Sequence, residues 1–574
     1  MNRIIKSHLA SFAHEYELDK DKEEQQFEKF ANFVILSGRI SSRFMLDEVT
    51  TENNDDGIDG VAVIINEELV VSKEDAEGVF AHERRNNEVE LIFIQAKTSE
   101  KFDLGDFLKF KESVLRFVES DTYEAESQVQ RDAKAVFDVV VDNASKVRDG
   151  RPSISVVFAT TGTYRHPKEL EKAKEKMITQ VQDLNIFKDI DVKFMGNNEI
   201  IKAWVASYSG INATLDMSSN AFLPTIAGVD EAYLVVVKAT DYVKNVLTNE
   251  DGTIRAQLFE ENVRHFLGSD NQVNMQIAET LKNESSKSMF PVLNNGVTIV
   301  SPNVEIRGAK LYISNYQIVN GCQTSYVLYE NKDVLSDDVM VTLKVVETTD
   351  EDVFSELVRA TNSQSKIEKS QFFSLNPVSK RIETYFNTYE GQDGRLYFER
   401  RYRQYVNKGI AALRIVSLQM AAKCVCSMFL RRPDLAYRYQ KEMYNSFGDK
   451  IFSEKNKEII YYASSLVLYR FHILTSNSYL PANARRFKWH ILPLVAEIVS
   501  GREIPDLASK KIEKYCDKII NLFSKPSDQV NKVFMKAIDA INSLGEVSDD
   551  RLKRQNVFSE MQKKLYETQN QNNK

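Results

Sequence analysis

The sequence predicts three consecutive folding units: an α/β domain with a mixed sheet, an α+β domain, and a region built of helices. The chain has 574 residues, too many for one core, because domains average roughly 150 residues. Helical and strand periodicities alternate in the first part, whereas the last part is helical almost without interruption. We therefore expect domains at residues 1–209, 210–432 and 433–574.

The spacing of apolar residues defines the elements of the first domain. Apolar positions recur every three or four residues from 23 to 36, which indicates a helix with one buried face. Further runs predict strands and helices in the order strand 61–65, strand 68–71, strand 89–95, helix 104–118, strand 154–159, helix 167–182 and strand 192–195. The charged segment 72–87 is expected to be a long hairpin loop or insertion. This order is typical of an α/β domain with a mixed sheet.

The second and third domains differ in their periodicity. A linker of low hydrophobicity near residues 207–210 precedes a block that mixes helices with short strands, predicted at 233–238, 297–300 and 340–346. From about residue 433, helices are predicted at 457–474, 490–500, 507–523, 528–544 and 551–568.

Composition restricts the class of protein. Hydrophobic residues make up 43% and charged residues 28% of the chain, which are ordinary values for folded domains. There are 75 basic and 83 acidic residues, a net charge of −8, so a nucleic-acid partner would need a locally basic groove. The four cysteines suggest neither a disulfide framework nor a zinc site. With neither a signal peptide nor an apolar run of about 18 residues, we expect a cytoplasmic protein without a membrane partner.

Three side chains of the first domain suggest the chemistry of phosphodiester hydrolysis. Asp59 lies in the turn GIDG at residues 57–60, which delivers it to the start of a strand, and Gln95 and Lys97 lie where another strand ends. Side chains alternate along a strand, so residues 95 and 97 point to the same side. Neighbouring strands can therefore bring Asp59, Gln95 and Lys97 into one pocket.

Such a pocket would suit Mg²⁺, with Mn²⁺ as a substitute, because hard cations prefer oxygen ligands and activate water for hydrolysis. Asp59 would supply a carboxylate, and the Gln95 amide oxygen and the Ala96 carbonyl would complete the protein ligands. Lys97 would hold the attacking water and offset negative charge in the transition state. Glu28, at the edge of the buried face of the first helix, is a candidate fourth group; the alternative is a solvated helix surface.

These parts resemble the PD-(D/E)XK, or restriction-endonuclease-like, superfamily and within it the Mrr-like branch. The match lies in their order: a helix with Glu28, then GIDG at 57–60, then IFIQAK at 92–97, then a strand ending in TTG at 160–162. The resemblance implies a restriction-endonuclease-like fold and a metal-dependent endonuclease. At Gln95 the superfamily usually has an acid. Glutamine at this position is similar to the Mrr-like branch, and it removes one negative charge from the site. A non-cutting relative of this superfamily and a coincidental match are the alternatives.

Four motifs of the central block resemble the AIPR family, named for abortive infection phage resistance. They are LFEENVRHFLG at 258–268, NNGVTI at 294–299, QIVNGCQTS at 317–325 and RATNSQ at 359–364. The resemblance runs from about Arg255 to Tyr405 and implies a role in bacterial antiviral defence, without defining a reaction.

The amides of these motifs are candidates for ligand or nucleic-acid contacts. Side-chain amides can read a base edge or a sugar, and Gly321 would let a ligand approach the backbone closely. The alternative is that the amides satisfy backbone groups of buried loops. The candidates are Asn295, Asn320, Gln323, Asn362 and Gln364.

Basic and aromatic residues alternate in the segment 395–405. Guanidinium groups can pair with phosphates while aromatic rings stack on bases, so this segment is a candidate nucleic-acid surface. A solvated charged face is the alternative. The candidates are Arg395, Tyr397, Arg400, Arg401 and Arg403.

Together these features predict an antiphage defence effector that acts as a Mg²⁺-dependent endonuclease. Double-stranded DNA is the expected substrate ahead of RNA, because the Mrr-like resemblance implies it. Two copies would cut both strands, so a homodimer is plausible, and the central motifs suit a phage-derived or nucleotide trigger. The alternative is a catalytically silent protein that binds nucleic acid or senses phage with the same domains.

Overall fold

A computed structural model describes most of the chain. It covers residues 1–572 except 19, 41–42, 52–56, 82–85, 121–122, 124–126, 209–210, 250–251, 256–257, 260–271, 363–376, 393, 401–403, 406–409, 438–439, 478 and 546.

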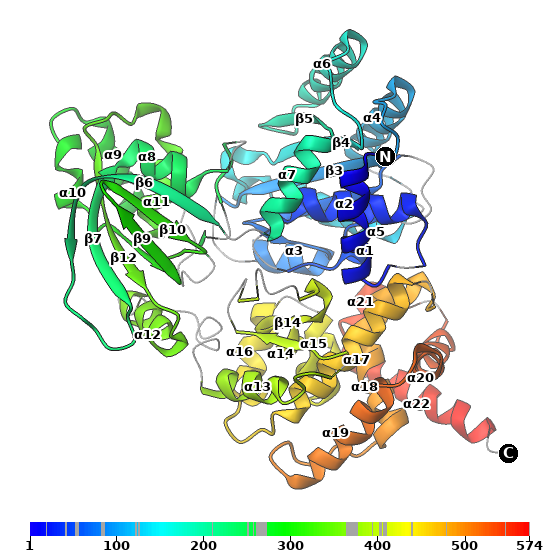
Figure 1. Ribbon diagram of the computed structural model, residues 1–574. Helices are drawn as coiled ribbons and strands as arrows, with labels where there is room; N and C mark the ends of the chain where they lie inside the picture. Colours follow the sequence, from blue (N-terminus) through cyan, green and yellow to red (C-terminus); the bar gives the residue numbers. More distant parts are fainter. Residues whose placement is uncertain are drawn as a thin grey trace.

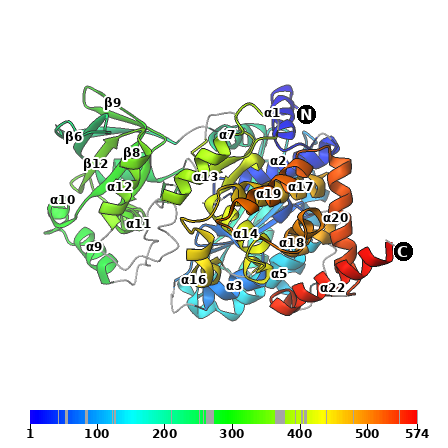
Figure 2. The ribbon, with the colours of Figure 1, turned by 90° about the horizontal axis from the view of Figure 1, so that it is seen from below.

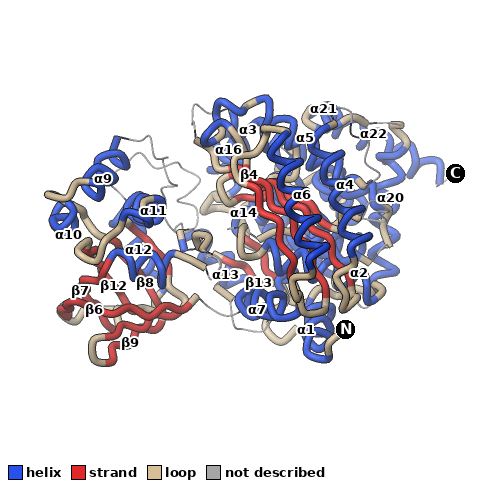
Figure 3. Tube along the Cα trace, turned by 90° about the horizontal axis from the view of Figure 1, so that it is seen from above, coloured by secondary structure: helices blue, strands red, loops and turns tan. Residues whose placement is uncertain are grey.

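A five-stranded mixed sheet lies among the helices of the first part of the chain (Figure 3). Its strand order is β2-β1-β3-β4-β5. β1 runs antiparallel to β2 and β3, whereas β3, β4 and β5 are mutually parallel. Gly60 is opposite Ile94, and Lys97 is opposite Thr160. The strands are β1 (Gly60–Ile65), β2 (Glu68–Leu69), β3 (Val89–Lys97), β4 (Ser153–Thr160) and β5 (Ile190–Met195).

Helices cover both faces of this sheet. Leu91 and Phe93 of β3 pack in one apolar cluster with α3 to α6, while Ile92 and Ile94 pack in the other with α1, α2 and α7. Side chains alternate between the two faces along a strand. Gln95 and Lys97 therefore point to the same face of the sheet as Leu91 and Phe93. The helices are α1 (Arg3–Glu15), α2 (Glu23–Leu36), α3 (Lys73–Phe80), α4 (Leu104–Glu119), α5 (Gln128–Asp142), α6 (Lys168–Asp183) and α7 (Asn197–Tyr208).

The central part is built on a seven-stranded sheet in the order β11-β8-β12-β7-β6-β10-β9. β12 pairs parallel with β8, and the other neighbours are antiparallel. The strands are β6 (Asn212–Phe222), β7 (Glu231–Lys238), β8 (Val297–Ser301), β9 (Asn303–Arg307), β10 (Lys310–Ser314), β11 (Gln317–Asn320) and β12 (Met340–Glu347). The helices are α8 (Ala239–Asp241), the π-helical turn Tyr242–Leu247, α9 (Gln272–Lys282), α10 (Phe290–Leu293), α11 (Cys322–Glu330) and α12 (Glu351–Asn362).

The last part, residues 377–572, is called here the helical region. Its core is one hydrophobic cluster that runs from Val378 to Leu565, so the predicted division at residue 432 falls inside it. A short parallel pair, β13 (Tyr397–Glu399) and β14 (Ile415–Ser417), joins this core. The helices are α13 (Pro377–Asn387), α14 (Leu418–Met428), α15 (Pro433–Tyr437), α16 (Gln440–Ile451), α17 (Ile459–Ser476), α18 (Lys488–Ser500), α19 (Lys510–Phe523), α20 (Ser527–Asn542), α21 (Asp549–Leu552) and α22 (Gln555–Asn572).

The helical region packs against the first part of the chain, and the central sheet stands to one side of both (Figures 1 and 2). Ion pairs link the first part to the helical region, including Lys553 with Glu74 at 2.6 Å. Arg148 links the first part to the central part through Glu330, at 2.7 Å. The first part of the chain is therefore linked by ion pairs to both of its neighbours.

Several sequence predictions are confirmed and some are wrong. The helix predicted at 23–36 is α2, whereas the predicted strand 89–95 continues to Lys97. The segment 72–87 contains helix α3 instead of being only a loop, because Ser72 caps it by accepting from the Asp75 N–H and its apolar face is buried. The single helix predicted at 551–568 is divided between α21 and α22, and α1, α5 and α7 were missed.

Hydropathy gives one further observation. Across the helices described in this structure, none is both long and apolar enough to cross a lipid bilayer.

Candidate functional site

The turn before β1 fixes Asp59 against β3. The Asp59 N–H donates to the Ile94 carbonyl at 2.8 Å, and the Ala96 N–H donates to Asp59 Oδ2 at 2.8 Å. Gly57 has φ +82°, and a Cβ there would lie 2.8 Å from Gln95 Nε2. The positive φ favours glycine at this position, and a Cβ would also press on the Gln95 amide. The turn brings the Asp59 carboxylate to the end of β3.

Gln95, the residue before Ala96, buries its side-chain amide. Its side chain is 1% exposed, and its Oε1 accepts no hydrogen bond from the residues that the structure describes. Leaving a buried polar atom unsatisfied is costly and rare in folded proteins. The oxygen is therefore a candidate donor atom for a cation.

Helix α2 places Glu28 near the same point. The pKa of Glu28 is raised to about 7, first by burial and then by the negative charge of Asp59, while Lys97 opposes the shift. Both Asp59 and Lys97 therefore lie within electrostatic reach of the Glu28 carboxylate. Two carboxylates that interact away from bulk water favour a bound cation or proton.

The donor atoms fit a hard divalent cation. Carboxylate, amide and carbonyl oxygens are the ligands of Mg²⁺ and Mn²⁺, and an ionised carboxylate has about four lone-pair sites, so the bond from Ala96 does not exhaust Asp59. Within the described ranges, no group of three or more His, Cys, Asp or Glu side chains is arranged for a metal. A cation at this point would accordingly need Gln95 as well as the acids Asp59 and Glu28.

Asn32 supports the site, although sequence reasoning missed it. Its side chain is fully buried, and its Nδ2 donates to the Asp59 carbonyl at 2.9 Å and to Thr50 Oγ1 at 3.0 Å. A Cβ on Gly60 would lie 2.2 Å from Asn32 Oδ1, so glycine lets helix α2 approach the turn. The available signal was a polar residue one helical turn after Glu28, among apolar positions of one face.

The loop after Lys97 is tied to the end of β4. Thr161 is fully buried, and its Oγ1 donates to the carbonyls of Thr98 and Ser99 at 2.8 and 3.2 Å. A Cβ on Gly162 would lie 1.8 Å from the Glu100 carbonyl. The motif at 160–162 thus fixes the chain that follows Lys97 and does not itself point to a ligand.

The central amide motifs mostly bind the protein itself. The Gly321 N–H donates to Asn320 Oδ1 at 2.7 Å, and Asn274 Nδ2 donates to Gln323 Oε1 at 2.9 Å. Asn295 is exposed. The side chain of Asn362 and all of Gln364 lie outside the described residues.

Asn294, which sequence reasoning did not select, has a clearer structural role. Its Oδ1 accepts from the Gly296 N–H at 2.9 Å and from Thr324 Oγ1 at 3.1 Å. Gly321 has φ +91°, and a Cβ there would lie 2.9 Å from the Gly296 carbonyl. These bonds join the two motif turns to each other.

The basic segment also uses its arginines internally. Arg395 donates to Asn387 at 2.7 Å and lies over the Tyr397 ring at 4.3 Å. Arg400 is 8% exposed and pairs with Glu383 at 2.6 Å. Binding a phosphate through Arg400 would require breaking this pair. Arg401 and Arg403 lie outside the described residues.

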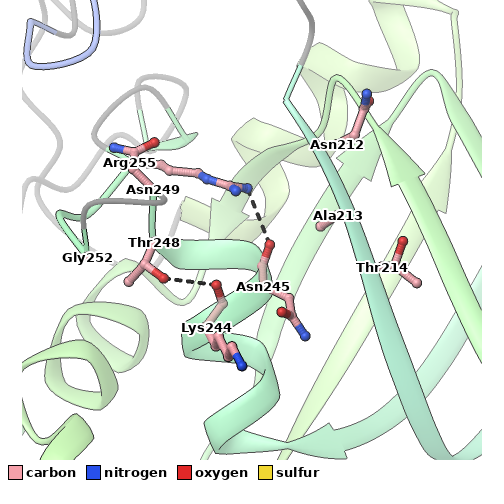
Figure 4. Close-up of a pocket in the computed structure, with 9 residues that line it drawn as sticks. All are labelled: Asn212, Ala213, Thr214, Lys244, Asn245, Thr248, Asn249, Gly252 and Arg255. Carbon is pink, nitrogen blue, oxygen red and sulfur yellow. Dashed lines mark hydrogen bonds between the residues drawn. The ribbon is translucent and has the colours of Figure 1, made fainter. Parts of the chain in front are cut away.

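A polar hollow of ≈ 550 Å³ lies between β6 and the π-helical turn (Figure 4). Arg255 Nη1 donates to the Asn245 carbonyl at 3.3 Å, and Thr248 Oγ1 donates to the Lys244 carbonyl at 2.9 Å. These side chains close the end of the turn. The hollow is lined by Asn212, Ala213, Thr214, Lys244, Asn245, Thr248, Asn249, Gly252 and Arg255.

Comparison with known families places the chain in a defined class. Residues 259–572 match the family described as AIPR protein, and this match covers more than half of the chain. The chain therefore belongs to the AIPR family, and membership indicates a role in antiphage defence. No curated protein and no solved structure matches it.

Proposed function

We propose that this protein is an antiphage defence effector that cuts nucleic acid as a Mg²⁺-dependent endonuclease. Its first domain would be restriction-endonuclease-like, of the Mrr-like branch. One arrangement carries the proposal: the Asp59 carboxylate is hydrogen-bonded to the Ala96 N–H beside the buried Gln95 Oε1. The AIPR match supports the defence role and covers none of these three residues.

Each residue has a role that follows from its chemistry. Asp59, Gln95 Oε1 and the Ala96 carbonyl would hold Mg²⁺, or Mn²⁺ in its place. The bound cation would neutralise phosphate charge and lower the pKa of a water. Lys97 would orient that water and offset the charge that develops on phosphate oxygens. Glu28, whose pKa is raised to about 7, is suited to accept a proton near neutral pH.

Double-stranded DNA is the proposed substrate, on the strength of the Mrr-like resemblance. A homodimer would place two sites on the two strands. The central part and the helical region, which carry the AIPR match, would receive the phage-derived or nucleotide trigger. We place this activity in the cytoplasm, where injected DNA is exposed.

A catalytically silent binding protein is the second candidate. One observation favours it: among the described residues, no group of three or more acids, histidines or cysteines is arranged for a metal, so Asp59 and Glu28 offer little negative charge to a cation. In that case the same pocket would contact nucleic acid without cutting it.

Incubation of the purified chain with plasmid DNA and Mg²⁺ or Mn²⁺ tests the choice. The endonuclease proposal predicts cutting by the wild type and loss of cutting in Asp59→Ala and Lys97→Ala. Lys172→Ala, at an exposed position on α6, is the matched control and should cut normally. No cutting by the wild type with either cation would favour the silent binder, and cutting that survives both changes would exclude this pocket as the centre.

A further inference from the structure

A short segment, residues 46–51, lies directly against the turn that carries Asp59. The Val61 N–H donates to the Val49 carbonyl at 3.0 Å, and the Thr51 N–H donates to the Asp59 carbonyl at 3.2 Å. Thr50 and Gly60 form an antiparallel bridge. The position of the Asp59 backbone is therefore set by this segment as well as by β3.

Side-chain bonds reinforce this contact. Thr51 Oγ1 donates to the Ile58 carbonyl, and Asn32 Nδ2 bridges Thr50 Oγ1 and the Asp59 carbonyl. Thr50 and Thr51 are both buried. These bonds join the segment, the turn with Asp59 and helix α2 in the buried interior. Because buried groups are closely packed, a shift of the segment would move Asp59 as well.

The other side of the segment is held by the helical region. Its 3₁₀ turn, Leu46–Glu48, presents two acids to bases of that region. Lys488 Nζ lies 2.8 Å from Glu48 Oε1, and both side chains are 18% exposed. Arg485 and His472 lie 3.5 and 3.6 Å from Asp47 Oδ2.

The electrostatics show that this contact is complementary. Burial raises the pKa of Asp47, but His472, Arg485 and Lys488 outweigh it, so the net shift is downward. Burial lowers the pKa of Lys488, but Glu48 and Asp47 outweigh it, so the net shift is upward. Removing one member of such a pair leaves an uncompensated charge that must move toward water.

We propose that the helical region positions Asp59 through residues 46–51 and so sets the cation affinity of the pocket. Lys488 and Arg485 are positioning residues in this scheme, since they touch the segment and not the reacting atoms. The inference rests on the proposed function for its consequence, because the positioned group is the cation ligand. It gives the AIPR part of the chain a physical route to the first domain.

A pair of matched variants tests the route in the full-length chain. Lys488→Met removes the charge that holds Glu48. Lys553→Met removes a comparable interface pair, because Lys553 lies 2.6 Å from the buried Glu74 of α3, an element outside the segment. Lys488→Arg retains the charge and serves as the conservative variant.

The first measurement is Mn²⁺ affinity, followed by electron paramagnetic resonance of the free ion, with Asp59→Ala identifying the site. Lys488→Met should raise the dissociation constant roughly 10-fold, the scale seen when a group that orients a metal ligand is lost. Lys553→Met and Lys488→Arg should stay close to the wild type. Equal weakening by both methionine variants, or no change in Lys488→Met, would overturn the proposal.

The second measurement does not depend on metal binding. Amide hydrogen exchange in residues 46–61 should quicken in Lys488→Met and stay unchanged in Lys553→Met. Equal exchange in both would overturn the positioning role. A wild-type chain that binds no Mn²⁺ but shows this difference in exchange would contradict the proposed function and retain the mechanical link.

Discussion

Side-chain amides serve opposite purposes in two parts of this molecule. In the first domain, Gln95 Oε1 is buried without a hydrogen bond from the described residues, and the N–H of the next residue, Ala96, donates to the Asp59 carboxylate. In the central part, the oxygens of Asn294, Asn320 and Gln323 accept from neighbouring donors of the protein. The amides that accept bonds from the protein are structural. An unsatisfied amide oxygen suggests a ligand only where other donor groups gather, because Asn32 Oδ1 and Gln317 Oε1 also accept no hydrogen bond from the described residues.

The contrast shows how a ligand site can be told apart from structural residues when both contain the same residue types. The sequence motifs of the central part are the more specific ones, and the family match includes most of that part. The arrangement that suggests chemistry nevertheless lies outside that match, where an acid, an amide and a lysine come together. Each variant below either sharpens or breaks this contrast.

The largest expected effect comes from Asp59→Asn. The change removes the ligand charge while an amide oxygen can still accept from the Ala96 N–H, so the fold should persist. Cation-dependent cleavage should fall by roughly 100- to 1000-fold, the scale of losing one key electrostatic group. Cleavage rates on plasmid DNA measure it, with Asn320→Ala as the comparison variant. Equal losses in the two variants would break the contrast.

Gln95→Glu should have the next largest effect, in the opposite direction. A third carboxylate beside Asp59 and Glu28 should tighten Mn²⁺ binding by about 10-fold, a difference of roughly 1.4 kcal/mol. Repulsion between the carboxylates should lower the melting temperature of the metal-free chain. Titration calorimetry and thermal unfolding give both values. Weaker Mn²⁺ binding in Gln95→Glu would show that the amide oxygen does not face the cation.

Asn294→Ala should lower stability without changing cleavage. Two donors, the Gly296 N–H and Thr324 Oγ1, lose their acceptor, at a cost of about 1–2 kcal/mol. Asn295→Ala, at the exposed neighbouring position, should change stability by less than about 0.5 kcal/mol. Urea unfolding compares the two. A larger loss in Asn295→Ala would reverse the assignment of the two amides.

The smallest expected effect is the pH dependence contributed by Glu28. Its pKa is raised from 4.5 to about 7, so the folded, metal-free chain binds this proton more tightly than the unfolded chain. Glu28 should therefore favour folding most at low pH, and this advantage should be lost as the pH rises through 7, by no more than about 3 kcal/mol.

Cation binding should show the opposite trend, because Glu28 adds negative charge to the pocket only after it has lost its proton. Mn²⁺ affinity should accordingly rise with pH through about 7. Glu28→Gln should flatten both profiles, whereas Glu169→Gln, at an exposed position on α6, should leave them unchanged. Parallel profiles in wild type and Glu28→Gln would remove Glu28 from the site.

Much of the first domain could be predicted because its signals are local. The helix at 23–36 and the strands around residues 61–65 and 154–159 follow from apolar periodicity, and the structure has them at nearly those bounds. Helix α3 was missed because charged residues cover one of its faces. Its cap at Ser72 and the buried Ala76 and Phe80 stabilise it nonetheless.

The candidate site was predictable in its principal side chains and not in its support. The alternation of side chains in a strand placed Gln95 and Lys97 on one side. The polar position of Asn32 on an apolar helix face was a weak signal, but its role and that of Thr50 come from bonds between segments distant in sequence. The same limit applies to Arg400, whose partner Glu383 lies on a different element and turns an apparently free arginine into an ion pair.

The position of Mn²⁺ in soaked crystals tests the central claim most directly, because manganese can be located by its anomalous scattering. The account predicts a single strong peak within about 2.0–2.6 Å of an Asp59 carboxylate oxygen and of Gln95 Oε1, the range for oxygen ligands of hard cations. Peaks only elsewhere, or none at this pocket at saturating Mn²⁺, would contradict it.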